Sequence, residues 1–426
     1  MKKHKLRWMR LDNAAKIYPA AKRRKWNNVF RLSATLTEAI DPFILQSALD
    51  VTVKRFPSIA MRLRRGMFWY YLEEIRKAPS VKKDTYYPLV QMPFEDIRRC
   101  AFRVLYYENR IAVEIFHVLT DGNGGMIFLK TLVAEYLSQK HNIAISNTNG
   151  VFDRTAEPTV GELEDSFLKY EGHVSASRQE STAYRLKGTP EKDEFLHLTT
   201  GIMDVNEVLQ TAKSYKVSLT EFITAVMIAS IMEIQNEKVP NRKHQKPVKV
   251  LIPVNLRKMF ESTSLRNFVL YITPGINPKM GQYSFEEIVK MIHHKMGIEV
   301  NDKHMASLIT ANVKAEKTLI LKIMPLFIKN FAMKTIFDMI GEKKSCITLS
   351  NLGAVNIPEQ MCPFVERFDF VLGIQATSPS NCGMLSFGDK LYINLIRNIK
   401  EPTLEHRFFT YLKKLGLNVK IESNQR

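Results

Sequence analysis

The chain has few of the features that mark a secreted or disulfide-stabilised protein. Its 426 residues include four cysteines, Cys100, Cys346, Cys362 and Cys382, which are far apart and have neither metal-ligand spacing nor the density of a disulfide scaffold. The basic residues at the start are not followed by an apolar run, so we expect no signal peptide. These absences favour a reducing, cytoplasmic location.

Long apolar runs are also lacking, and no stretch reaches the ~20 predominantly apolar residues of a transmembrane helix. The most apolar run, residues 318–337, is interrupted by Lys322, Lys329, Lys334 and Pro325. One interpretation is an amphipathic helix on a membrane surface. The other, which we favour, is a pair of helices that lines a core or pocket, with the lysines extended toward water.

Motifs for binding metal, nucleotide phosphate or nucleic acid are missing too. There is no HExxH or CxxC, and the GNGG stretch at 122–125 lacks the lysine and hydroxyl residue of a phosphate-binding loop. The adjacent His293 and His294 point to different sides of a predicted helix, so they form no metal pair. No zinc finger, helix-turn-helix or aromatic RNA-binding signature accompanies the basic residues. We therefore expect no metal site and no nucleic-acid partner.

Positive charge is abundant instead. The formal net charge is +19, which attracts anionic partners such as anionic lipid or a phosphate-rich small molecule like coenzyme A. Charge alone does not choose between these partners. For most of the lysines, keeping the protein dissolved is an equally good explanation.

The hydrophobic pattern predicts alternating strands and helices through most of the chain. The first helix has Asp41 as its N-cap, Pro42 at its first position and Pro57 beyond its end. Another helix begins just beyond GNGG, two more open with the capping boxes Ser218–Glu221 and Ser284–Glu287, and the last starts at Thr403. The predicted strands cover residues 29–36, 60–75, 102–116 (a hairpin turning at 108–110), 248–255, 268–276, 347–353, 370–377 and 390–396.

This order of elements predicts an α/β fold of the α+β sandwich kind, with one similar unit in each half of the chain. The length also exceeds what one hydrophobic core usually supports. We place an N-terminal lobe at residues 1–175, a polar connection at 176–192 and a C-terminal lobe at 193–426.

The strongest chemical signal is EIFHVLTDGNGG, residues 114–125. A strand brings His117 to its end, and Asp121 and Gly122 lead into the next helix. Histidine has an ordinary pKa of ~6.5, so it can accept a proton near neutral pH and serve as a general base. A lone histidine at a strand end is more often structural, but the surrounding motif favours catalysis. We expect Asp121 to hold the turn by pairing elsewhere.

HxxxDG at His117–Gly122 resembles the signature of the chloramphenicol acetyltransferase-like superfamily, which includes peptide-synthetase condensation domains, wax ester synthases, plant acyltransferases and alcohol acetyltransferases. Residues 252–268, IPVNLRKMFESTSLRNF, look like the family's stretch in which an arginine precedes an asparagine or glycine and an aromatic residue. TLSNLG at 348–353 is similar to the SN-containing segment of the wax synthase and alcohol acetyltransferase branches. The likeness covers nearly the whole chain and is strongest to bacterial alcohol acetyltransferase-like proteins.

The resemblance implies two lobes that meet along a tunnel, with an acyl thioester entering from one face and the acceptor from the other. It implies that His117 is the general base and that Asp121, supported by Gly122, pairs with Arg257 of the other lobe. It also implies acyl-CoA as a co-substrate, with no permanently bound cofactor and no covalent enzyme intermediate. Ser350 and Asn351 are candidates for oxyanion or substrate contacts, although a structural role at the strand end is the alternative.

Two departures from the family pattern limit the comparison. Phe116 stands where many relatives have a second histidine, and the DFGWG motif of the plant branch is absent. Three functions therefore stay open: acyl transfer from acyl-CoA to a small alcohol or lipid-like acceptor, transfer from a carrier protein to a hydroxyl or amine, and binding without catalysis. Peripheral contact with a membrane is compatible with each of them.

Overall fold

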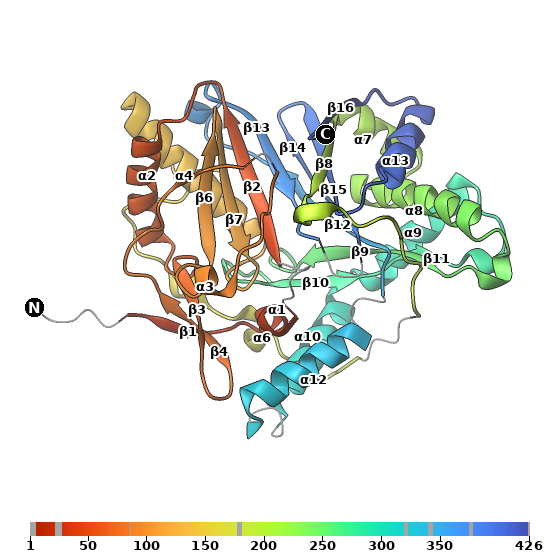
Figure 1. Cartoon of the computed structure of the whole chain (residues 1–426), viewed down its shortest axis with the longest axis horizontal. Coiled ribbons are helices and arrows are strands. Elements are labelled where there is room, and N and C mark those ends of the chain that lie inside the picture. The colour runs from red at the N-terminus through yellow and green to blue at the C-terminus, as the bar shows by residue number, and fades with distance from the viewer. Residues whose placement is uncertain are drawn as a thin grey trace, which may run out of the picture.

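The computed structural model describes residues 6–21, 28–85, 87–176, 181–318, 323–339, 344–374 and 378–424. Two main sheets face each other across the middle of the molecule, and helices cover the outer face of each sheet (Figure 1). This arrangement of paired α/β layers is the predicted fold class.

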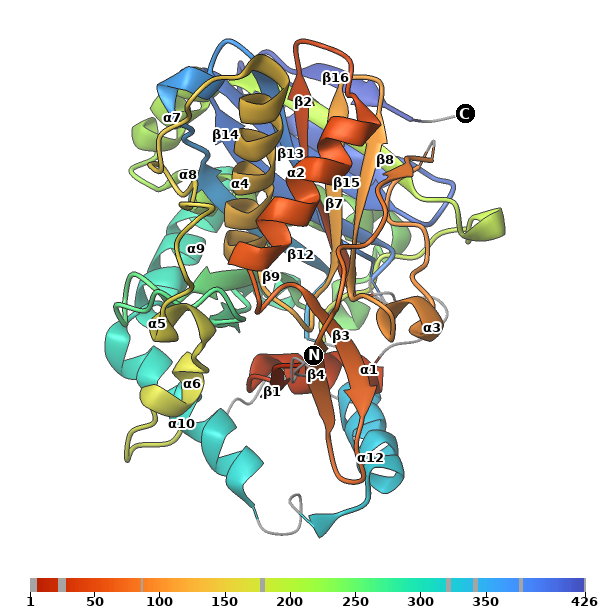
Figure 2. The same cartoon turned by 90° about the vertical axis from the view of Figure 1, so that its left-hand side faces the viewer.

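The first sheet contains, among the described residues, five strands in the order β13-β2-β7-β6-β5. Helices α2 and α4 cover its outer face (Figure 2). Helix α2 begins as predicted, because the Asp41 carboxylate accepts hydrogen bonds from the amides of Phe43 and Ile44 and Pro42 occupies the first turn. The elements are β2 (Val29–Leu36), β5 (Lys82–Lys83), β6 (Phe102–Tyr107), β7 (Arg110–Phe116), β13 (Val365–Val371), α2 (Pro42–Arg55), α3 (Phe94–Ile97) and α4 (Gly122–His141).

The second sheet, over the same described ranges, has the order β10-β9-β12-β14-β15-β8-β16, with β11 also paired to β9. The capping boxes predicted at Ser218 and Ser284 open α8 and α9, and α8 packs against α7, α9 and α13. The strands are β8 (His197–Asp204), β9 (Val248–Asn255), β10 (Val269–Ile272), β11 (Gly275–Ile276), β12 (Ile347–Ala354), β14 (Ser380–Phe387), β15 (Lys390–Arg397) and β16 (Lys420–Ser423). The helices are α7 (Val205–Ser214), α8 (Leu219–Lys238), α9 (Phe285–Glu299) and α13 (Thr403–Lys414).

A smaller sheet, β1-β4-β3, extends from the base of the first lobe and lies beside α1 and α12 (Figure 1). Its strands are β1 (Trp8–Arg10), β3 (Met61–Arg65) and β4 (Tyr70–Glu74). The remaining helices are α1 (Ile17–Ala21), α5 (Val160–Leu163), α6 (Ser166–Lys169), α10 (Asp302–Lys317) and α12 (Leu326–Met339). Within the described ranges, no single helix is long and apolar enough to cross a membrane, and only α7 and α8, bent by 80°, reach that length and composition together.

Strand β13 connects the two halves of the sequence. It lies late in the chain but pairs antiparallel with β2 in the first sheet, where it places the buried Phe368 and Phe370 beside the N-terminal core. The lobe boundaries at 175 and 193 stay a prediction. The first sheet, however, is built from residues on both sides of those boundaries.

Some sequence-based predictions were wrong in detail. Helix α4 begins at Gly122, so the GNGG glycines form its first turn instead of preceding it. The strand predicted at 370–377 is β13, which ends at Val371, and residues 375–377 lie outside the described ranges. Strand β14 was missed because SNCGMLSF is rich in small residues and has no clear alternation.

We expect a fragment of residues 1–175 not to fold alone, because without β13 the edge of β2 is unpaired and apolar surface stays exposed. The measurement is urea unfolding followed by far-UV circular dichroism, with the full chain as reference. Mixing the fragment with residues 176–426 should restore a cooperative transition. A cooperative transition from the fragment by itself would show that β13 is dispensable.

Candidate active site

His117 directly follows the last residue of β7, and a short turn carries the chain from it to Asp121, the N-cap of α4. Its backbone amide donates to the carbonyl of Asn28 at 2.8 Å, which continues the pairing between β7 and β2. The imidazole is therefore held at the end of a paired strand. This backbone hydrogen bond fixes the position of the His117 main chain independently of its side-chain contacts.

His117 lines a cavity of about 560 Å³ between the lobes. The first lobe contributes β2, α4 and His117 at the end of β7 to its wall, and the second contributes β9, β10 and β12. Among the described lining residues only Asp121 and Lys130 are acidic or basic apart from His117 itself. Most of the wall is apolar, and includes Ile17, Phe30, Met126, Ile127, Leu251, Val269, Leu270, Leu352, Val355, Phe370 and Leu372.

Asn267 sets the tautomer of His117. The Asn267 amide nitrogen donates to the Asp12 carboxylate at 3.2 Å and to the His117 carbonyl at 3.0 Å. These two bonds orient the amide so that its oxygen lies 3.0 Å from Nδ1 of His117. Because an amide oxygen only accepts, Nδ1 must carry the proton, and Nε2 is left with a free lone pair.

Two aromatic rings hold the imidazole from its sides. Tyr18 stacks on it with ring centroids 4.6 Å apart, and Phe30 meets it edge-on at 5.0 Å. Burial lowers the pKa of His117 below its ordinary value of 6.5, although the nearby Asp121 carboxylate opposes this shift. The ring is consequently neutral at pH 7 and able to accept a proton.

The Asp121 carboxylate uses both of its oxygens. One accepts hydrogen bonds from the amides of Asn123 and Gly124 at 3.1 and 3.2 Å, and so caps α4. The other accepts from the Arg257 guanidinium at 2.8 Å and from the amide of Phe268 at 3.0 Å. Asp121 makes no hydrogen bond to His117, so it acts on the turn and on the lobe contact.

Arg257 extends this contact into the second lobe. Its Nε donates to the carbonyl of Ser264 at 2.7 Å, and its Nη2 donates to the carbonyl of Arg266 at 2.5 Å. The Arg257 and Asp121 side chains are only 8% and 4% exposed. The guanidinium thus holds the segment that carries Asn267 while it is itself neutralised by Asp121.

Close packing requires a glycine at position 124 of α4. A Cβ on Gly124 would overlap the Thr120 hydroxyl and the backbone carbonyl of Leu265. A Cβ on Gly122 would lie 2.7 Å from the end of the Leu352 side chain of β12, which could move aside. The first turn of α4 therefore approaches the Leu265 backbone too closely for a side chain at position 124.

Ser350 and Asn351 both lie on β12 and line the cavity. The Asn351 amide nitrogen donates to the Thr220 hydroxyl at 3.0 Å, and its oxygen accepts from the amide of Gly353 at 2.8 Å. These two bonds hold the strand end and leave one amide proton of Asn351 without a partner among the described residues. The Ser350 hydroxyl forms no hydrogen bond with any described residue.

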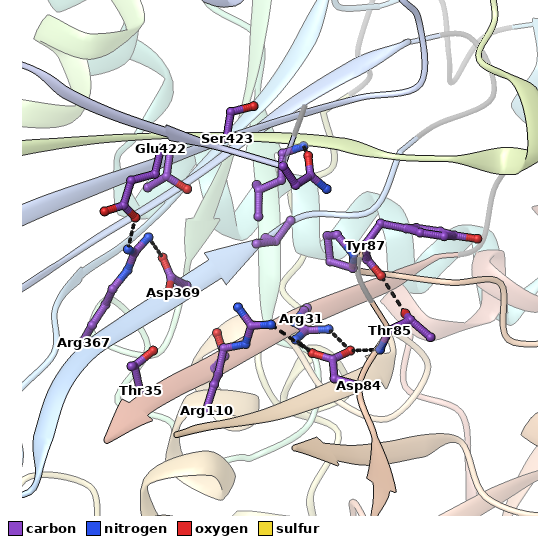
Figure 3. Close-up of a pocket in the computed structure, with 16 residues that line it drawn as sticks. Arg31, Thr35, Asp84, Thr85, Tyr87, Arg110, Arg367, Asp369, Glu422 and Ser423 are labelled. Atoms are coloured by element: carbon purple, nitrogen blue, oxygen red, sulfur yellow. Dashed lines mark hydrogen bonds and ion pairs between the residues drawn. The ribbon is translucent and has the colours of Figure 1, made fainter. Parts of the chain in front are cut away.

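A second recess of about 250 Å³, lined by charged groups, lies between the two main sheets (Figure 3). Arg31 and Arg110 share the Asp84 carboxylate, while Arg367 bridges Asp369 and Glu422. The Arg367–Glu422 pair joins β13 of the first sheet to β16 of the second. Because each arginine faces a carboxylate, the recess is charge-balanced and holds the sheets together. A third recess shares Val29 and Gly373 with the main cavity.

Asn267, Asp12 and Tyr18 were not predicted as site residues. Asn267 lies in the RNF part of the family-like stretch 252–268, so its position was noticed but its role was not. Asp12 and Tyr18 belong to the N-terminal segment, and nothing in the local sequence indicates that this segment reaches His117. Within the described residues, no three His, Cys, Asp or Glu side chains are grouped as metal ligands.

Removing one partner of the Asp121–Arg257 pair should destabilise the fold by ~3–5 kcal/mol, because a buried charge is left unpaired. The measurement is the free energy of unfolding in urea for Asp121→Ala, Arg257→Ala and the double variant. The double variant should lose less than the sum of the singles. Lys390→Ala, which breaks an exposed ion pair with Asp389, is the control and should cost under ~1 kcal/mol. Equal losses for buried and exposed pairs would contradict this assignment.

Nitrogen NMR of the imidazoles tests the tautomer of His117. At pH 8 its Nδ1 should be protonated and its Nε2 unprotonated, and on acidification the ring should titrate with a midpoint below 6.5. His117→Ala identifies the signals. In Asn267→Leu, the neutral ring should become a mixture of tautomers, because the acceptor at Nδ1 is lost. A protonated Nε2 at pH 8 in the unaltered protein would contradict the proposed geometry.

No family model matches the sequence, and no curated protein matches it. Solved structures do match over nearly the whole chain. Polyketide synthase associated protein 5 from Mycobacterium tuberculosis has a TM-score of 0.60 at 14% identity and covers 95% of this chain and 97% of its own.

Two further matches have a bound ligand or an activity in their descriptions. TRI101 of F. sporotrichioides, solved with coenzyme A and T-2, has a TM-score of 0.59 at 11% identity, covering 97% of this chain and 99% of its own. The wax ester synthase/diacylglycerol acyltransferase from Marinobacter aquaeolei has a TM-score of 0.56 at 12% identity, covering 96% and 100%. Condensation domains also match, among them that of the Monacolin K polyketide synthase. Together with the paired sheets, these matches show that the chain shares the fold of these proteins, condensation domains included.

Proposed function

We propose that the protein is an acyltransferase that moves an acyl group from an acyl thioester, with acyl-CoA as the expected donor, to the hydroxyl of an alcohol. The observation that carries the proposal is a neutral His117 whose Nδ1 is engaged by Asn267 and whose Nε2 is free, at the wall of a largely apolar cavity. A histidine in this state is ready to act as a general base.

In the proposed reaction, Nε2 of His117 takes the proton of the acceptor hydroxyl while the acceptor oxygen attacks the thioester carbonyl carbon. The tetrahedral intermediate carries the negative charge on the former carbonyl oxygen. When the carbon–sulfur bond breaks, the sulfur leaves as a thiolate and receives the proton from His117. The products are an ester and a free thiol, and the enzyme returns to its starting protonation state.

The oxyanion needs a hydrogen-bond donor in the cavity. We propose Ser350 for this role, because its hydroxyl lines the cavity and has no partner among the described residues. Asn351 is less suited, because its amide nitrogen already donates one proton to Thr220 and its amide oxygen accepts from Gly353, which fixes the side chain toward the strand end. We therefore propose that Asn351 supports the strand end instead of contacting the oxyanion.

The cavity wall supports an apolar acyl chain or acceptor. Asp121 is neutralised by Arg257, and the Lys130 ammonium donates to the carbonyls of Asn149 and Asn356. Burial also lowers the pKa of Lys130 to about 8. A cationic acceptor would therefore find no unpaired carboxylate among the described lining residues, and the one ammonium is already bonded to two carbonyls. A medium-chain or lipid-like alcohol would instead contact the apolar side chains.

The test is release of free thiol from acetyl, octanoyl and palmitoyl thioesters of coenzyme A with a panel of alcohols. His117→Ala should lower the rate by ~10²–10⁴-fold and Ser350→Ala by ~10²-fold. His293→Ala, which alters an exposed histidine paired with Glu221, is the matched control and should keep the activity of the unaltered protein. Activity that survives His117→Ala would overturn the proposal.

The same assay separates the donors. If coenzyme A is recognised, its thioesters should react faster than the corresponding N-acetylcysteamine thioesters, which lack the nucleotide. Equal rates with both would point to a carrier-bound donor, which is the condensation-type alternative. No turnover with either donor, in a protein that binds the alcohol, would support a binding protein on the same fold.

A further inference from the structure

The first turns of helix α12 expose several large apolar side chains and bury a lysine, within the part of the helix whose side chains the structure describes. Phe327 and Phe331, one helical turn apart, are 65% and 73% exposed. Ile323, one turn before them, is 64% exposed. Lys329 on the opposite face is only 1% exposed. Leu326 is buried, as expected of a helix on a soluble core, but exposed phenylalanines opposite a buried lysine depart from that pattern.

The buried face of α12 is fixed to the tip of the β3–β4 hairpin. The Lys329 ammonium donates to the carbonyl of Phe68 at 2.8 Å and lies 3.2 Å from the centroid of the Trp69 ring. The amide of Leu326 donates to the carbonyl of Met67 at 3.0 Å. From the sequence we expected these lysines to extend toward water, and for Lys329 this prediction was wrong. The side chains of Lys322 and Lys334 lie outside the described residues.

The hairpin tip adds two exposed side chains to those of the helix. Met67 is 76% exposed and Phe68 40% exposed, and both lie where the tip meets the first turn of α12. The tip and the helix project from the same end of the molecule in both views (Figures 1 and 2). We call these side chains the apolar end, which consists of Met67, Phe68, Ile323, Phe327, Ile328 and Phe331.

The charges around the apolar end are positive. The sequence has no acidic residue between Arg65 and Leu72, or between Ile323 and Phe337. Arg10 and Arg65, on the two outer strands of the small sheet, are exposed and form no ion pair with any described residue. A second copy of this chain would bring the same positive charges together, which disfavours self-association through this end.

We propose that the apolar end docks the protein onto the surface of an anionic lipid bilayer. Aromatic and aliphatic side chains that project from a helix and a turn can enter the boundary between headgroups and acyl chains, while flanking arginines bind lipid phosphates. The helix lies on the membrane in this arrangement and does not cross it. The net charge of +19 adds a long-range attraction to the same surface.

The apolar end is adjacent to the cavity. Helix α12 packs against α1, and Ile17 and Tyr18 of α1 line the cavity that contains His117. If the proposed acyl transfer holds, docking would bring the cavity wall close to the bilayer and favour a lipophilic acceptor drawn from it. This last step rests on the proposed function, whereas docking itself does not.

The test is co-sedimentation of the full chain with vesicles of phosphatidylcholine, with or without phosphatidylglycerol. The unaltered protein should bind the anionic vesicles more strongly than the neutral ones, and added salt should weaken binding. Phe327→Ser combined with Phe331→Ser should lower the partition coefficient at least ~10-fold, because both rings leave the interface. The thermal midpoint of this variant should match that of the unaltered protein, since both rings are exposed.

Phe43→Ser combined with Val160→Ser is the matched control. These side chains are 84% and 85% exposed but lie elsewhere, so the variant should bind vesicles normally. His117→Ala should also bind normally, which separates docking from catalysis. Absence of binding to anionic vesicles, or equal binding by the Phe327/Phe331 variant, would overturn the proposal. Loss of a dimer in that variant without any vesicle binding would instead identify a protein interface.

Discussion

The Asp121 carboxylate is the contact on which the geometry of the site depends. One of its oxygens caps the N-terminus of α4, and the other accepts hydrogen bonds from the Arg257 guanidinium and the amide of Phe268. A single buried group thereby determines where the helix begins and how the second lobe approaches it. Because Asn267 immediately precedes Phe268, the same contact places the amide that orients His117. The charge pair is costly to bury, and its carboxylate is satisfied by four hydrogen bonds, which is the condition under which burial is tolerated.

The second constraint is the way the two lobes share the imidazole. The first lobe supplies His117 from the end of a strand, but the second lobe supplies the amide oxygen that selects its tautomer. Neither lobe alone therefore fixes the tautomer of this imidazole. The N-terminal segment adds Asp12 and Tyr18, so three separate parts of the chain meet at one ring. Such a site is sensitive to the relative placement of the lobes, and this explains why the lobe contact is built from buried ionic groups and a glycine.

The sequence predicted the features that are encoded locally. The N-cap at Asp41, the capping boxes at Ser218 and Ser284, and the strand end that carries His117 depend on neighbouring residues, and the structure contains all of them. Asn267 and Asp12 are separated by 255 positions, so their contact has no local signature. The burial of Lys329 was also missed, because a lysine in an apolar run normally extends toward water. The resemblance to a known superfamily supplied the Asp121–Arg257 pair, which spacing alone does not give.

Strand β13 has a consequence for how the chain is made. Strand β13 pairs with β2, so one edge of residues 29–36 stays unpaired until residues 365–371 have been synthesised. At a synthesis rate of about 5–20 residues per second, the interval between the synthesis of β2 and that of β13 is roughly 17–70 s. During this interval β2 presents unpaired backbone groups, which are a template for pairing with other chains. The nascent protein would then depend on chaperones or on rapid provisional packing for longer than a protein whose domains are contiguous in sequence.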